Sequence, residues 1–247
     1  MCYNIAFIEK KLETLAKRFN AGTIHGPIFH PPLFHASAFT HPYWPVLLHQ
    51  QEWQIDFYRW GLIPSFTKNW DAALKISTMT GNCIGEEAFE KPSFRKPIRT
   101  NRCVIPVSGF YEWRTENGVK YPYYIFPNND DYFFLGGVYD EWVNPANNDL
   151  LKTFSIITCE ANPLLAKIHN TKKRMPLILS ENNLTHWLDK DLNRDDVLLM
   201  VTPYDQQLMQ AHTISRKITD RKNYVNDESL IHEFSYPELQ LLDALIN

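Results

Sequence analysis

The feature that most constrains the fold is a series of short apolar and aromatic runs, each bounded by proline, glycine, asparagine or serine. Runs of about four to eight such residues between turn-forming residues are typical of β-strands. Two of them, residues 103–107 and 110–113, follow one another across Ser108-Gly109. The other predicted strands cover residues 3–8, 57–60, 123–126, 132–138, 153–158, 175–179 and 198–201.

Helices are predicted between these strands. Apolar residues recur on one helical face over residues 9–19. Shorter helices are expected over 162–169, near 86–90 and, with Ser180 as a cap, over 181–188.

The order of these elements favours one mixed domain over residues 1–247, because no internal repeat or linker divides the chain. Polar stretches at 128–131 and 144–148 are typical of hairpin tips. The motifs discussed below lie within 1–179, and the sequence assigns no role to the segment 221–247.

Composition excludes several classes of function. The net charge of −3 gives no overall attraction to nucleic acid, so a site for a polyanion has to be a local basic patch. The N-terminus lacks the pattern of a signal peptide and the apolar runs are strand-sized, so we expect a cytoplasmic protein without a membrane partner. Four cysteines without CxxC spacing predict neither a disulfide framework nor a zinc site, and the histidines within 24–50 lack the spacing of metal ligands.

The first two residues carry the most specific chemistry. Because Cys2 is small, we expect an aminopeptidase to remove Met1 and to leave a free α-amine beside the Cys2 thiol. The reference pKa values of these groups, roughly 7.7–8.0 and 8.5, make both partly nucleophilic near neutral pH. An amine forms an imine with an aldehyde, and the adjacent thiol then closes a five-membered thiazolidine ring. Taken alone, a cysteine at position 2 also fits a frayed terminus without function.

Capture of an aldehyde needs a group that moves protons, an imidazole and a neutral hydrogen-bonding side chain. Glu112 stands among apolar residues in GFYEW, where burial would raise its pKa. His169 ends a predicted helix, and Asn82 follows Gly81 in a predicted turn. Each also fits a role without chemistry: an exposed glutamate on a strand, a surface histidine and a turn asparagine.

Five motifs in order carry a family resemblance. They are Met1-Cys2, WGLIP at 60–64, an asparagine segment before KPSFR at 91–95, RCVIPVSGFYEW at 102–113, and ANPLLAKIH at 161–169 with RMP at 174–176. Together they resemble the SRAP family of abasic-site processing proteins. The resemblance implies a single α+β domain in which a bifurcated, mostly antiparallel sheet folds into a pseudo-barrel with flanking helices.

The resemblance also implies a function in DNA repair and the SOS response. The mature Cys2 would capture the ring-opened aldehyde of an abasic site in single-stranded DNA as a thiazolidine, without a cofactor, and so shield the lesion. Asn82 would hydrogen-bond at the site, and Glu112 would assist proton transfer and removal of Met1. His169 would help to open the deoxyribose ring and to reverse the adduct. Lyase activity through the imine and autopeptidase activity toward Met1 are further expectations.

A DNA groove is implied as well. Trp60, Pro64 and Arg174 match positions that line it, where aromatic rings stack on bases and arginine grips phosphates. We expect a monomer that binds single-stranded DNA, holds no metal and is nucleoid-associated when bound. The predicted DNA-binding set is completed by neighbours of these motifs: Arg95, Lys172, Lys173, Met175 and Pro176.

The chain departs from the family pattern at four positions. Tyr3 and Asn4 replace the glycine and arginine of an MCGR start, and Ile84 and Glu87 replace the arginine and threonine of a NARSET-like segment. The loss of two cations and the gain of an anion predict weaker DNA binding with a shallower dependence on salt. Two lysines before the RMP motif are placed to compensate.

Two alternatives stay open at this point. In a cysteine hydrolase or autopeptidase, Cys2 would attack a carbonyl with Glu112 or His169 as the base, and thiolate alone would suffice. In a module that binds single-stranded nucleic acid without chemistry, Cys2→Ser would change nothing. Covalent capture is the reading that accounts for all four residue types together.

Overall fold

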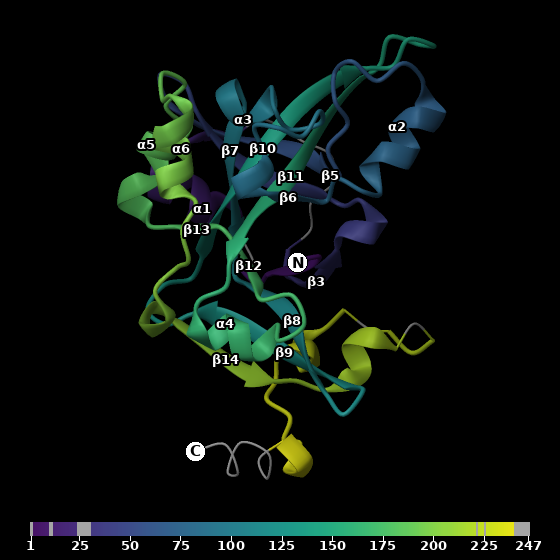
Figure 1. Ribbon diagram of the computed structural model, residues 1–247, viewed down its shortest axis with the longest axis vertical. Helices are drawn as coiled ribbons and strands as arrows, with labels where there is room; N and C mark the ends of the chain where they lie inside the picture. The colour runs from purple at the N-terminus through teal and green to yellow at the C-terminus, as the bar shows by residue number, and fades with distance from the viewer. Residues whose placement is uncertain (1, 10–11, 24–30, 221, 225, 240–247) are drawn as a thin grey trace.

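The structure is a computed structural model, and it describes residues 2–9, 12–23, 31–220, 222–224 and 226–239 (Figure 1).

A closed ring of strands lies at the centre of the part so described. β10 pairs antiparallel with β11 and with β7, β4 joins β7 to β5, and a short parallel pairing of β5 with β11 closes the ring. All six side chains of β7 are buried, so both faces of this strand of the ring are covered. The strands of the ring are β4 (Tyr43–His49), β5 (Trp53–Trp60), β7 (Arg102–Val107), β10 (Phe133–Val143) and β11 (Leu150–Glu160).

Short strands extend the ring at its edges. β12 and β6 pair with β11, β13 pairs with β10, and β2 pairs with β5. Their bounds are β2 (Gly22–Thr23), β6 (Asn82–Ile84), β12 (Arg174–Pro176) and β13 (Ile178–Leu179).

A second sheet lies below the ring in Figure 1, in the order β14-β9-β8-β1-β3, with the N-terminus between the two. The chain passes from β7 directly into β8 at Ser108-Gly109, so one continuous stretch serves both sheets. Gly109 is required there, because a Cβ atom would lie 2.6 Å from the Ile125 carbonyl oxygen. The strands of this sheet are β1 (Asn4–Phe7), β3 (Leu33–Ser37), β8 (Gly109–Glu116), β9 (Val119–Pro127) and β14 (Met209–Thr213).

Helices surround the two sheets. α4 begins at Pro163 after Asn162, whose side chain accepts a hydrogen bond from the Leu165 amide at 2.8 Å, and it ends at Ile168, with His169 as its C-cap. No helix of the described residues is long and apolar enough to cross a membrane. The helices are α1 (Leu12–Phe19), α2 (Trp70–Ser77), α3 (Pro97–Thr100), α4 (Pro163–Ile168), α5 (Leu184–Leu188) and α6 (Arg194–Met200), with 3₁₀ turns η1 (Ala38–Thr40), η2 (Gly85–Glu87), η3 (Glu181–Asn183), η4 (Gln206–Leu208), η5 (Arg216–Thr219) and η6 (Glu228–Leu230).

A continuous apolar core joins the ring to the second sheet. Phe110 and Ile125 from the second sheet belong to the same cluster of buried side chains as Val104 and Phe154 from the ring. The mixed α+β class and the bifurcated, mostly antiparallel sheet are therefore as the family resemblance implies.

Several local predictions were wrong. Residues 198–201 are not a strand but the end of α6, because Asn193 and Asp196 cap that helix reciprocally. Residues 128–131 do not form a hairpin tip, since they connect β9 in one sheet to β10 in the other. The helix expected near 86–90 is the 3₁₀ turn η2. Within the C-terminal segment 221–247, residues 221, 225 and 240–247 lie outside the described residues.

Candidate active site

Cys2 lies two residues before β1, the strand between β8 and β3 in the second sheet. Its side chain is fully buried, with Sγ 3.9 Å from the Asn4 carbonyl oxygen. β1 pairs antiparallel with β8 through Ile5 and Phe110, and continuing this register brings Glu112 to the level of Tyr3. The pairing of these two strands therefore delivers a carboxyl group to the N-terminal end of the chain. Burial raises the pKa of the Cys2 thiol above its ordinary value, and the charge of Glu112 acts in the same direction.

Glu112 is a buried carboxyl group, with 4% of its surface exposed. Burial raises its pKa to about 7, because the charged form loses its hydration. Near neutral pH the side chain is therefore present both as an acid and as a base. Of the two situations that the sequence left open for Glu112, the buried one is confirmed.

His169 faces Glu112 from the end of α4. The distance from its Nε2 atom to Oε2 of Glu112 is 3.9 Å. Nδ1 lies 2.8 Å from the Arg174 carbonyl oxygen, and because that oxygen only accepts, Nδ1 carries the proton in the neutral ring. The basic nitrogen of the ring is then the one that faces Glu112. Burial lowers the pKa of His169, so the neutral form prevails at pH 7.

Asn82 approaches the site from the ring. It opens β6, which runs parallel to β11 with Asn82 opposite Ile156, so the predicted turn is in fact a strand. Its side chain is 7% exposed, and neither amide atom has a partner in hydrogen-bond geometry among the described residues. The Tyr3 phenol lies beside the Asn82 side chain, and this polar contact lowers the phenol pKa against the larger, opposite effect of burial. A buried amide without partners costs about 1–3 kcal/mol, and a ligand that paired with it would recover that cost.

Of these residues, Glu112 and His169 open onto one large cleft, while Cys2 and Asn82 lie behind its lining. Its volume is about 1140 Å³, and Glu112 and His169 line it together with Tyr3 and Asn4. Lys120 and Lys172, both exposed, line the same cleft and offer positive charge to an anionic ligand.

The predicted DNA-binding residues fall into three groups. Arg95, Lys172 and Lys173 are exposed, and of these Lys172 lines the cleft. Arg174 is half-buried. The remaining side chains are buried in this structure, and their contact with DNA stays a prediction: Trp60, Pro64, Met175 and Pro176.

Trp60 has a structural part. It stacks on Phe154 inside the ring, with ring centroids 5.9 Å apart, and its Nε1 donates to the Gly81 carbonyl oxygen at 2.8 Å. The residue thereby supports the segment that leads into Asn82.

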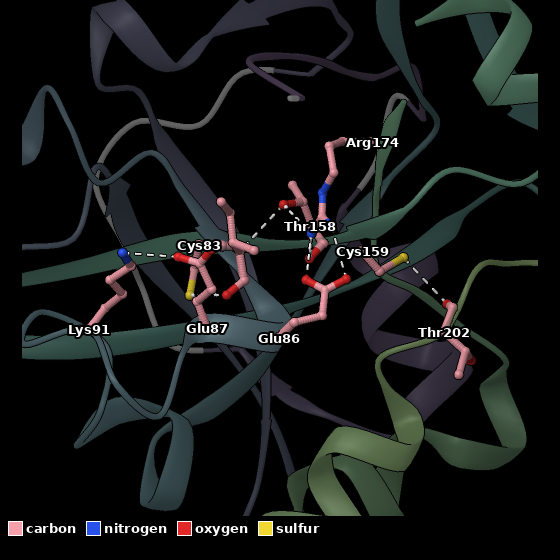
Figure 2. A network of polar contacts seen from close by, with 9 residues as sticks. Cys83, Glu86, Glu87, Lys91, Thr158, Cys159, Arg174 and Thr202 are labelled. Atoms are coloured by element: carbon pink, nitrogen blue, oxygen red, sulfur yellow. Dashed lines mark hydrogen bonds and ion pairs between the residues drawn. The ribbon is translucent and has the colours of Figure 1, made fainter. Parts of the chain in front are cut away.

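Arg174 is engaged within the protein. Figure 2 shows its guanidinium between Glu86 and Thr158: it donates to both Glu86 carboxylate oxygens, at 2.9 and 2.7 Å, and to the Thr158 carbonyl oxygen at 2.7 Å. Glu87, the anion that departs from the family pattern, pairs with Lys91 at 2.9 Å. The added negative charge on this face is therefore offset locally.

Sequence reasoning missed several residues that line the cleft. Tyr3 was noticed only as a departure from a motif, and its position next to Cys2 was the available signal. Phe39, Lys120 and Tyr224 come from a 3₁₀ turn, a hairpin and the C-terminal segment, and nothing local in the sequence links them to Cys2.

The chain matches a known protein family and several known proteins in sequence. The model of the family described as SOS response associated peptidase (SRAP) matches residues 1–221. The chain is 38% identical over 167 residues to the abasic site processing protein YoqW of Bacillus subtilis, covering 67% of this chain and 71% of that one. It is 29% identical over 209 residues to the abasic site processing protein HMCES of Gallus gallus, covering 72% of this chain and 60% of that one.

Solved structures show the same architecture. A crystal structure of a protein from Bacteroides thetaiotaomicron superposes with a TM-score of 0.85 and 31% identity, covering 95% of this chain and all of that one. A protein from Bordetella bronchiseptica shares the fold, with a TM-score of 0.72 and 22% identity over 87% of this chain and all of that one.

Proposed function

This chain belongs to the SRAP family, and we propose that it processes abasic sites in single-stranded DNA by capturing them covalently at Cys2. The observation that carries the proposal is the convergence of Glu112 and His169, 3.9 Å apart, beside the buried Cys2 at the wall of one cleft. The names of the relatives from Bacillus subtilis and Gallus gallus supply the substrate class.

The reaction starts from the mature chain, in which removal of Met1 has freed the Cys2 amine. The closed abasic sugar must first open to its aldehyde: the C1′ hydroxyl loses its proton, the C1′–O4′ bond breaks, and O4′ takes up a proton. The basic Nε2 of His169 is the group that accepts the hydroxyl proton, and the imidazolium returns a proton to O4′. The amine nitrogen then adds to the aldehyde carbon, and a proton passes from nitrogen to oxygen to give a carbinolamine.

Glu112 serves the two steps that follow. As a carboxylic acid it protonates the carbinolamine hydroxyl, which leaves as water and gives the protonated imine. The thiol sulfur then adds to the carbon of the protonated imine while the Glu112 carboxylate takes the thiol proton, which completes the thiazolidine and restores the acid. One molecule of water is released and no electrons are exchanged. A pKa of about 7 suits Glu112 to both roles.

Asn82 and the lysines hold the substrate in this scheme. The Asn82 amide offers a donor and an acceptor to the sugar hydroxyls or to the Cys2 amine. Lys120 and Lys172 at the cleft supply charge for phosphates next to the lesion.

The test is denaturing electrophoresis of the protein with a single-stranded oligonucleotide that contains one abasic site. We expect a band that survives denaturation and is absent with an intact oligonucleotide. Cys2→Ala and Cys2→Ser lack the thiol and should give no such band. Because both keep the α-amine, each should give a band only when borohydride reduces the imine.

Cys159→Ser is the matched control, because Cys159 is a buried free thiol on β11, away from the cleft lining. It should crosslink as the wild type does. If wild-type protein whose mass shows that Met1 is gone forms no stable band, covalent capture is wrong. A thiol ester with an acyl substrate would then support the hydrolase alternative. The same mass measurement on Glu112→Gln tests the autopeptidase role, since retention of Met1 is expected there.

A further inference from the structure

Two aromatic rings stack on the wall of the cleft directly beside Cys2. The Tyr3 and Phe39 rings lie with centroids 5.1 Å apart at an angle of 29°. Both line the cleft that Glu112 and His169 line. Phe39 is 66% exposed, which makes it the most exposed aromatic side chain among the described residues of the cleft.

The backbone around the pair is fixed. The Ala38 amide donates to the Tyr3 carbonyl oxygen at 2.9 Å, which ties η1 to the residue after Cys2. Gly81 allows the close packing, since a Cβ atom there would meet the Ala38 Cβ at 3.3 Å and the Tyr3 ring at 3.5 Å. These contacts place the backbone at Phe39 beside Tyr3, while the Phe39 ring itself stays largely exposed.

The chemistry of the pair favours a nucleobase. An aromatic ring with an exposed face stacks on any base, because every base has a π-face. Burial raises the pKa of Tyr3, so its phenol stays neutral and adds no negative charge near a phosphate. In a strand attached to Cys2 through an abasic sugar, the bases on either side lie within one nucleotide, while Tyr3 is the next residue along the chain.

We propose that the exposed face of Phe39, backed by Tyr3, is a stacking site for the base adjacent to the lesion. This inference rests on the proposed function and assigns the partner of one wall of the cleft. It also gives Tyr3 a positioning role, because a base fixed on the pair would hold the sugar against Cys2. Stacking of this kind is insensitive to salt and would replace part of the cationic contact that the family pattern places at positions 4 and 84.

The experiment combines a protein change with a DNA change. Crosslinking rates are measured at limiting protein for wild type and Phe39→Leu, which keeps an apolar side chain and removes the π-face. The oligonucleotides carry natural bases on both sides of the abasic site, or an inert tetrahydrofuran residue in place of the 5′ or the 3′ neighbour. Phe234→Leu, a phenylalanine that is 47% exposed and not among the residues lining the cleft, is the control and should behave as wild type.

On the natural oligonucleotide, Phe39→Leu should slow crosslinking by about tenfold, within the range for loss of one base–aromatic stack. Removing the neighbouring base on one side should slow the wild type by a similar factor and should leave Phe39→Leu unaffected. The rate at saturating protein should change little, because Phe39 touches no reacting atom. If both base removals slow Phe39→Leu as much as wild type, or if Phe39→Leu has no effect, the stacking site is wrong.

Equilibrium binding separates this result from failure of covalent capture. The same comparison is made by fluorescence anisotropy with tetrahydrofuran at the lesion itself, where no bond forms. Loss of coupling between Phe39 and the neighbouring base in both assays overturns the stacking site. Coupling in binding without any crosslink overturns covalent capture alone.

Discussion

At the scale of single residues, burial of Glu112 both supports its proposed function and lowers the stability of the folded protein. The burial that brings its pKa to about 7 also penalises the folded state whenever the side chain is ionised. In the unfolded chain the group ionises near 4.5, so folding above that pH works against its charge.

We therefore expect Glu112→Gln to stabilise the protein at high pH. The free energy of unfolding of the wild type falls as the pH rises from about 4.5 to about 7, because the unfolded chain ionises at Glu112 more readily than the folded one. The glutamine variant has no charge at this position and lacks this pH dependence. The gain should be close to zero at pH 4.5 and reach about 3 kcal/mol at pH 8. Urea unfolding at both pH values measures it.

Glu52→Gln, at an exposed position between β4 and β5, is the control and should show no comparable gain. An equal effect of Glu112→Gln at the two pH values would mean that the carboxyl group titrates normally.

His169 is the second residue whose protonation can be read from a rate. His169→Asn keeps a donor at the position of Nδ1, next to the Arg174 carbonyl oxygen, and removes the nitrogen that faces Glu112. We expect it to slow crosslinking by about 10²–10⁴-fold at pH 7.5. Because the wild-type ring protonates below its ordinary range, the ratio of the two rates should shrink as the pH falls toward 5.

The ratio is the informative quantity, since titration of the Cys2 amine affects both proteins alike. A ratio that stays constant between pH 5 and 8 would show that His169 acts only by packing.

At the scale of elements, the C-terminal segment covers an edge of the second sheet. β3 is the last strand of that sheet, and Asn226 pairs with both backbone groups of His35 on it, at 3.0 and 3.3 Å. The His35 side chain in turn lies 3.0 Å from the Tyr224 hydroxyl and 2.8 Å from Oδ1 of Asn4. The segment thereby satisfies an exposed strand edge and braces the strand that follows Cys2.

Removing the hydrogen bonds between Asn226 and His35 should destabilise β3 locally without unfolding the ring. We expect Asn226→Ala to speed amide hydrogen exchange in β3, because the His35 amide loses its acceptor. Exchange in β10 and β11, in the middle of the ring, should not change. Mass spectrometry of peptides from the two regions gives the comparison, and uniform acceleration would show a global loss of stability instead.

Most strands of the ring and of the second sheet were predictable because their apolar runs and turn residues are local signals, but β3, β4 and β14 were not predicted. β7 and β8 were found on either side of Ser108-Gly109 for this reason. α6 was missed because its apolar end resembles a strand, and the capping pair that decides the matter stands before that end, at Asn193 and Asp196.

The candidate site was predictable only in part. The residue types at Cys2, Glu112 and His169 pointed to aldehyde chemistry, and the burial of Glu112 stayed open because a strand pattern does not say which face is covered. The pairing register that joins β1 to β8, and the partners of Arg174, depend on contacts between distant segments. No local pattern in the sequence contains that information.

At the scale of the whole molecule, the charge balance governs how DNA would be held. The net charge is −3, and Arg174, a cation that the resemblance assigns to DNA, is paired with Glu86. We expect the affinity for single-stranded DNA to fall only gently with salt. Glu86→Gln should release the Arg174 fork and steepen the slope of log affinity against log salt by about 0.7.

Binding titrations over a series of salt concentrations test this expectation. Glu90→Gln, which removes the ion-pair partner of exposed Arg194, is the comparison. An unchanged slope in Glu86→Gln would remove Arg174 from the DNA-binding surface.

The pairing of β1 with β8, a strand made much later in the chain, affects when the candidate site can form during synthesis. β1 can pair with β3 early, but β8, which carries Glu112, follows Cys2 by more than one hundred residues, and His169 follows more than fifty residues after that strand. Cys2 therefore has neither the acid nor the base of the site beside it until these later segments have been made. The aldehyde chemistry proposed for this protein therefore requires that β8 and the end of α4 first pack beside Cys2.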